Sequence, residues 1–205
     1  MISPLDMGHL KLGDRVTIHF PQVRRFDGKR ANGEDDPAIG NSRIITLTGA
    51  TTLGGWRCAD GATPFPSKTV TNNTFSNIVG GTAAITVLDV SFSPSSTITG
   101  NLVSSITGGV GTAAVVGITS SSGTQLFESN TVHTITASTT STVSGISLTG
   151  GTAQTLSRNK VYNIENTNAA PTSANGILVT SGTTTNLYNN LIGDIRAPNA
   201  SATNP

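Results

Sequence analysis

Residues 156–164 read LSRNKVYNI, and this stretch carries the pattern that decides the fold. Leu156 stands three positions before Asn159, while Val161 and Ile164 follow it at two and five positions. The same arrangement of apolar residues around an asparagine occurs four more times. The five asparagines are Asn73, Asn101, Asn130, Asn159 and Asn190, at intervals of 28, 29, 29 and 31 residues. A repeat period of roughly 20–50 residues is typical of a solenoid.

Short apolar segments recur between the asparagine motifs and predict one strand each. They are 84–87, 115–118, 145–148 and 176–179. Turns rich in Gly, Ser and Thr follow them, and no segment shows the 3.6-residue periodicity of a helix. One repeat therefore consists of short strands joined by turns, and the fold class is all-β.

The five asparagines are expected to point into the molecule together with their apolar neighbours. A buried amide is costly unless it is hydrogen-bonded. Stacked at the strand spacing of about 4.8 Å, each carboxamide can donate to the next, as in cross-β structures. Asparagine also tolerates the left-handed backbone that a sharp corner needs, so the ladder residues themselves are expected at the corners. The alternative is a set of surface turns that use Asn, which leaves the fixed apolar neighbours unexplained.

The repeat, including its asparagine ladder, resembles that of right-handed parallel β-helix proteins. The residues that carry the resemblance are Gly176, Ile177 and Val179, followed by Leu187, Asn190, Ile192 and Ile195. The resemblance covers about residues 70–195, and a degenerate coil extends it towards Ile44. It implies a solenoid of about five to six coils of roughly 29 residues. The style of the loops resembles that of secreted or cell-surface bacterial members of this class, which include polysaccharide lyases and hydrolases, adhesins and proteins of unknown role.

The chain divides into three predicted regions. Residues 1–43 are expected to form an N-terminal cap or irregular leader, and 44–197 the β-helix. Within the β-helix, Gly and Pro residues predict an irregular loop insertion over 50–68. A polar tail occupies 198–205, and because the next strand of the repeat would be due there, we expect the chain to be a fragment of a longer protein.

Charge and cysteine content exclude several classes of function. There are 12 basic and 11 acidic residues, so no general field favours nucleic acid. The basic residues Arg24, Arg25, Lys29 and Arg30 are either a binding patch or a solvated surface, with acidic residues interleaved. No apolar run reaches the length of a membrane span, and no secretion signal begins the chain. With three His and one Cys, we expect no metal site and no cofactor.

No catalytic group is predicted. The strands that correspond to the catalytic face of pectin-degrading β-helix enzymes carry no charge here, which departs from those enzymes. Glu128 and Arg158 are expected on adjacent coils, either as an acid with an electrostatic partner or as an exposed salt bridge. His133 and Tyr162 both stand three positions after a ladder asparagine and should face outward side by side. They form either a platform for a sugar ring or an ordinary surface stack.

Two functions from different classes follow. The first is a non-catalytic, extracellular or cell-surface β-helix module of a bacterial surface protein, with a structural or carbohydrate-binding role and polysaccharide as its partner. The alternative is a fragment of a polysaccharide lyase or hydrolase with its catalytic residues outside this chain. End-to-end self-association of uncapped coils is a third expectation.

Overall fold

A computed structural model describes residues 45–46, 52–57, 67–91, 95–169 and 172–199. The chain divides between residues 42 and 43, and every described residue belongs to the second part, 43–205. The predicted N-terminal cap or leader lies outside the described residues, as do positions 200–205 of the predicted tail.

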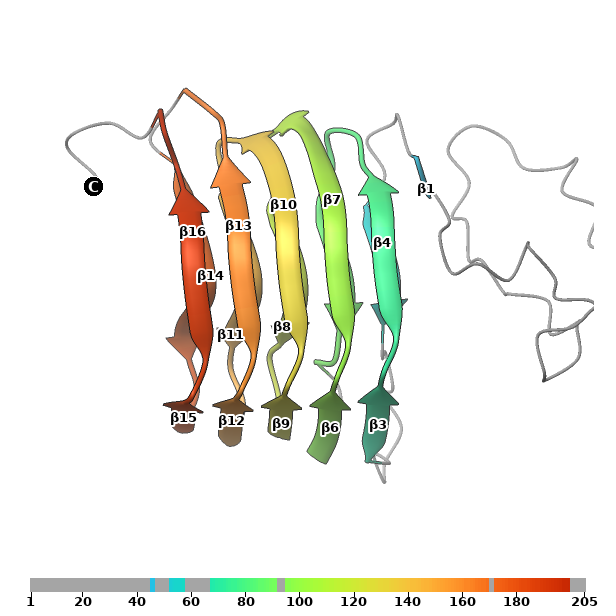
Figure 1. Ribbon diagram of the computed structural model, residues 1–205, viewed down its shortest axis with the longest axis vertical. Helices are drawn as coiled ribbons and strands as arrows, with labels where there is room; N and C mark the ends of the chain where they lie inside the picture. The colour runs from blue at the N-terminus through green and yellow to red at the C-terminus, as the bar shows by residue number, and fades with distance from the viewer. Residues whose placement is uncertain (1–44, 47–51, 58–66, 92–94, 170–171, 200–205) are drawn as a thin grey trace, which may run out of the picture. The chain divides into compact units, whose positions relative to one another are not determined.

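Sixteen strands form three sheets, and every strand pairs in parallel with the strand one turn away (Figure 1). The six-stranded sheet contains β1 (Ile45–Thr46), β4 (Thr74–Val79), β7 (Leu102–Gly111), β10 (Thr131–Thr139), β13 (Lys160–Asn166) and β16 (Leu191–Arg196). The second sheet contains β2 (Leu53–Arg57), β5 (Ile85–Asp89), β8 (Val115–Ser120), β11 (Thr142–Thr149) and β14 (Ser173–Ser181). The third contains β3 (Lys68–Thr71), β6 (Ser95–Thr99), β9 (Thr124–Glu128), β12 (Ala153–Ser157) and β15 (Thr184–Tyr188).

This topology is a parallel β-helix of about 4 turns of ~29 residues, as the repeat predicts. The described residues contain no helix. The sequence-based number of five to six coils is higher because β1 with β2, and β15 with β16, form only partial turns at the two ends of the described stack.

Two columns of left-handed residues explain the spacing of the inward side chains. Alternate residues of a strand face the same side, so an odd spacing would place two side chains on opposite faces. A left-handed residue precedes each ladder asparagine, at Asn72, Gly100, Ser129, Arg158 and Asn189. A second stands four positions after it, at Asn77, Ser105, Thr134, Asn163 and Asp194. Each bend restores the inward direction at the next apolar position. The expectation that the ladder asparagines themselves are left-handed is wrong, because the preceding residue makes the corner.

The ladder itself is confirmed, and Asn130 illustrates its geometry. Its Oδ1 accepts hydrogen bonds from the backbone N–H and the Nδ2 of Asn101, both at 3.0 Å. Its Nδ2 donates to the Ile98 carbonyl at 2.8 Å and to Asn159 Oδ1 at 3.0 Å. Both donors and both lone pairs of the amide are thus used, which removes the cost of burying it.

The same bonds connect all five asparagines. Asn73 donates from its backbone N–H and its Nδ2 to Asn101 Oδ1, and Asn159 donates in the same way to Asn190 Oδ1. The three central members, Asn101, Asn130 and Asn159, are no more than 1% exposed. The ladder is therefore a continuous interior column that fixes the register of successive turns.

A column of glycines in the second sheet lets that sheet approach the six-stranded sheet closely. A Cβ on Gly117 would lie 2.6 Å from the Gly145 carbonyl oxygen and 2.8 Å from Val132 Cγ1. Gly145 and Gly176 face Val161 and Ile192 in the same way. The large side chain of each pair fills the space that its glycine leaves, which is how the core reaches close packing.

The prediction of an irregular loop insertion over 50–68 is wrong for one stretch. Leu53–Arg57 forms β2 and pairs in parallel with β5, from Leu53 opposite Ile85 to Arg57 opposite Asp89. Tertiary pairing with the next turn overrides the low strand propensity of Gly54 and Gly55. Residues 58–66, the remainder that contains both prolines, lie outside the described residues.

We predict that Asn130→Ala destabilises the protein by about 3 kcal/mol or more, because it leaves the donors of Asn101 and the Ile98 carbonyl buried without partners. Urea unfolding followed by circular dichroism measures this change. The control is Asn186→Ala on exposed β15, where we expect less than about 0.5 kcal/mol. Equal effects for the two variants would contradict the ladder as the main polar element of the core.

We predict that Gly117→Ala costs about 1–3 kcal/mol, because the added methyl group meets a backbone oxygen that cannot move away freely. Gly193→Ala in β16 is the matched control, since a Cβ there meets no atom within 4 Å. The same urea titration compares the two. A loss at Gly193 as large as that at Gly117 would show that close packing is not the cause.

Candidate functional site

The most distinctive feature of the outer surface is a pair of stacked aromatic rings on the six-stranded sheet. His133 on β10 lies in register with Tyr162 on β13. The centroids of the two rings are 4.8 Å apart and their planes differ by 3°. Tyr162 is 39% exposed. The structure thus brings together the two residues singled out in the sequence, while their role in ligand binding stays a prediction.

The column that contains this pair is otherwise made of small residues. In register along the sheet stand Ser76, Ser104, His133, Tyr162 and Gly193. Each occupies the outward position between a core residue and the second left-handed residue of its turn. Ser104, beside His133, is buried. At the other end the register places Gly193 beside Tyr162, so no side chain follows the tyrosine ring on that side.

A chain of hydrogen bonds runs alongside the stacked pair, through the left-handed column. His133 Nδ1 lies 2.9 Å from the Thr134 hydroxyl oxygen, and Asn163 Nδ2 donates to the same oxygen at 3.1 Å. Arg196 then donates to Asn163 Oδ1 at 2.8 Å. These hydrogen bonds hold the imidazole edge of His133 in place and leave amide and guanidinium groups near the surface.

Every carboxylate in the described part of the chain is paired with an arginine. Asp89 pairs with Arg57 at 3.1 Å, and Glu128 pairs with Arg158 on the adjacent turn. Arg196 serves both Glu165, at 3.0 Å, and Asp194, at 3.3 Å. The Glu128–Arg158 contact that the sequence predicts is therefore present as an ion pair. The arginine has a side chain 63% exposed, so we assign the pair little stability.

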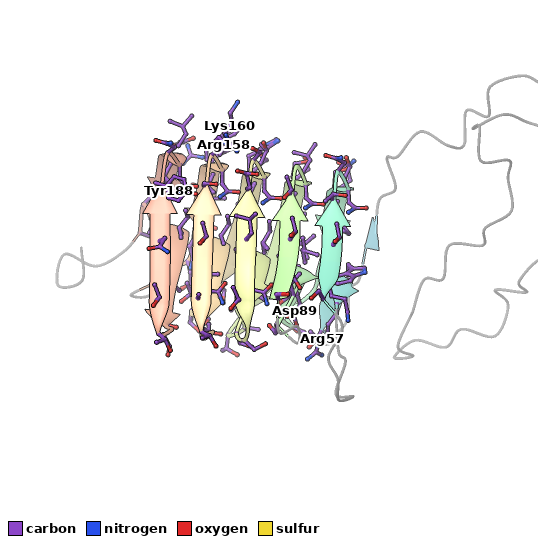
Figure 2. All side chains as sticks on the ribbon, turned by 90° about the horizontal axis from the view of Figure 1, so that it is seen from below. Arg57, Asp89, Arg158, Lys160 and Tyr188 are labelled. Carbon is purple, nitrogen blue, oxygen red and sulfur yellow. The ribbon has the colours of Figure 1, made fainter. Side chains whose placement is uncertain are left out.

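Lys160 is the cation nearest in sequence to the stacked pair, two residues before Tyr162 on β13. It is exposed and, within the part of the chain that the structure describes, forms no ion pair. Figure 2 shows Lys160, Arg158 and Tyr188 on one side of the coil stack, away from Arg57 and Asp89. Lys160 is thus an exposed cation close in sequence to the stacked rings that no carboxylate of the described residues compensates.

Burial lowers the pKa of His133 below the ordinary value of 6.5. The cause is desolvation, to which the stacked tyrosine ring contributes by covering one face of the imidazole. The uncharged imidazole is therefore the favoured form at neutral pH. A neutral ring stacks on tyrosine without the cost of desolvating a cation.

Other kinds of site find no support among the described residues. No group of three or more His, Cys, Asp or Glu side chains lies where a metal ion could bind them. No helix in the described ranges is long and apolar enough to cross a membrane.

The last turn exposes several large apolar side chains, Val179, Leu187, Tyr188, Leu191 and Ile192. End-to-end self-association stays a prediction, and these residues are the surface that it would use.

Two residues that shape this part of the molecule were not predicted from the sequence. One lies beside Tyr162 on the outer face of the six-stranded sheet, and the other is buried at the end of β13. Gly193 was not considered, although its position three residues after Asn190 places it in the same column as Tyr162. Asn166 is fully buried and donates from Nδ2 to the carbonyls of Thr139 and Ser141, both at 3.0 Å. It does not repeat at the ladder period, so the pattern gave no signal for it.

Comparison of the chain with protein-family models, with curated proteins and with solved structures found no match. The fold defines the chain as a parallel β-helix protein.

We predict that His133 titrates below pH 6.5 and that Tyr162→Ala raises its pKa towards 6.5 by uncovering the ring. The folded state binds this proton less tightly than the unfolded state. The contribution of His133 to the free energy of unfolding is therefore fully present above pH 6.5, the ordinary pKa, and is lost as the pH falls from there through the lower pKa of the folded state. NMR titration of the imidazole signals measures the pKa, with His133→Gln identifying the resonance among the three histidines. A pKa at or above 6.5 in the wild type would contradict the burial of the ring.

Proposed function

We propose that this chain is a non-catalytic, extracellular polysaccharide-binding module of a bacterial surface protein, built on a right-handed parallel β-helix. The observation that carries the proposal is the partly exposed His133–Tyr162 stack, in a column whose other members are serine and glycine. An aromatic face offers apolar contact to the C–H groups of a pyranose ring, and the polar edge of the site offers hydrogen bonds to its hydroxyl groups.

The polar groups around the rings suit a sugar. Asn163 is part of the hydrogen-bonded column beside the stack, and Arg196 reaches it from the next turn. Lys160 adds three donors without a competing carboxylate. Donors flanking an apolar face give orientation and specificity, as is usual for small polar ligands.

The absence of an available acid supports binding without turnover. Hydrolysis of a glycosidic bond uses two carboxyl groups that flank the scissile bond. In the described residues the four carboxylates belong to ion pairs, and none lies in the column of His133 and Tyr162. The extracellular location rests on the resemblance of the repeat to that of secreted proteins.

We predict that the protein is retained on at least one immobilised polysaccharide and that Tyr162→Ala weakens retention about tenfold, the loss of roughly 1.4 kcal/mol of stacking. Affinity electrophoresis in gels that contain neutral or acidic polysaccharides measures the retention. Tyr188→Ala removes an exposed tyrosine from β15 and serves as the control, because no ring stacks on it.

Two results would contradict the proposal. Release of unsaturated or reducing-end products from a retained polysaccharide would show an enzyme instead of a binding module. Equal retention of the wild type and of Tyr162→Ala, or retention lost in Tyr188→Ala instead, would place the binding surface elsewhere.

A further inference from the structure

We propose that Gly193 opens a slot on the free face of Tyr162 and that one sugar ring of the ligand occupies it as the third member of the stack. This inference rests on the proposed function and names the subsite at which a ring binds. It depends on three observations: the stacked pair, the register of the strands and the space at Gly193.

The two faces of Tyr162 have different surroundings. His133 covers one face, at 4.8 Å between ring centroids and nearly parallel. Because β13 lies between β10 and β16, the other face is directed towards the position of Gly193. The tyrosine is 39% exposed, and Gly193 contributes no side chain to cover it.

The space beside the Gly193 backbone is open to a side chain. A Cβ at this position would find no atom within 4 Å. By contrast, a Cβ at Gly117 or at Gly176 would meet core side chains at short range. Gly193 has no positive φ, so its backbone would accept another residue. The glycine is thus required neither by close packing nor by backbone conformation.

The lining of the slot fits a ring with one apolar and one polar side. Tyr162 forms its floor, and Leu191, 63% exposed and in register with Lys160, is an apolar residue two positions before Gly193 that faces the same side of β16. Lys160 stands two residues before Tyr162 and supplies a donor, while Asp194, next to Gly193, is ion-paired with Arg196. Strand spacing of about 4.8 Å sets the distance at which successive rings stack along this sheet, and a pyranose placed at the next spacing would lie on Tyr162.

The experiment fills the slot with the protein's own side chain. Gly193→Phe should place a third ring on Tyr162, leave the thermal unfolding temperature unchanged or higher, and abolish ring binding. Ser76→Phe is the matched control, because it adds the same ring to the same column at β4, two strands away from His133. The probes are methyl β-D-glucopyranoside and its uronate counterpart, so that a neutral and an anionic ring are both offered.

The readout is the shift of backbone amide signals in NMR titrations of the full chain. We expect a probe to shift the amides of Tyr162 and Gly193 in the wild type and in Ser76→Phe. In Gly193→Phe and Tyr162→Ala the apparent affinity should fall at least about tenfold. Unfolding curves recorded for each variant show that it is folded.

The possible results separate this proposal from the proposed function. If Gly193→Phe is folded and binds a probe as the wild type does, the ring does not occupy the slot, although polysaccharide binding elsewhere on the stack stands. If neither probe shifts Tyr162 or Gly193 while a polysaccharide retains the protein, the slot is again overturned. If no probe binds and no polysaccharide retains the protein, both proposals fail.

Discussion

The rest of the structure depends on the hydrogen bonds of one interior column of carboxamides. Each central asparagine receives two hydrogen bonds at Oδ1 and donates two from Nδ2, one of them to a carbonyl of the preceding turn. An amide buried to this degree is tolerated only because all four bonds are made. They are made only if the next asparagine lies directly above at the spacing of neighbouring strands. A turn that slipped by one residue would lose these bonds and turn its apolar side chains outward.

The left-handed residues on either side of the ladder bend the backbone so that each turn keeps its apolar side chains in the interior beside the asparagine. They let apolar residues at odd spacings share the interior, so that Leu156, Asn159 and Ile164 of one turn all face the core although strand alternation alone would separate them. The glycines of the opposite sheet complete the interior by making room for valine and isoleucine. With both sides of the core fixed, outward positions of successive turns also fall into register.

The sequence predicts the interior well and the exterior only in part, and the reason is physical. Ladder and core positions must repeat, because each contacts its own equivalent one turn away, so their spacing reveals them. Leu53–Arg57 was missed because pairing with β5, which is not local, outweighs the weak strand preference of its glycines. The residue that makes each corner was also misassigned. At that position the turns use Asn, Gly, Ser or Arg, so residue type alone gives no consistent signal. Gly193 stands at the same offset from its ladder asparagine as Tyr162, but a glycine has no side chain that suggests a function, so its offset was not interpreted.

A surface site on such a scaffold is formed by the register of neighbouring turns, which brings together residues that no single sequence motif contains. His133 and Tyr162 are 29 positions apart and belong to a column whose other members are serine or glycine. Their rings stack because the ladder holds β10 and β13 at a fixed offset, and the core gains nothing from them, since both point away from it. Stability in this fold comes from interior contacts between neighbouring turns. Outward residues are therefore free of the repeat, and an aromatic pair followed by an open position has no structural requirement behind it. That freedom is the physical reason for our proposal that the stacked rings, and the space beside them, recognise a ligand.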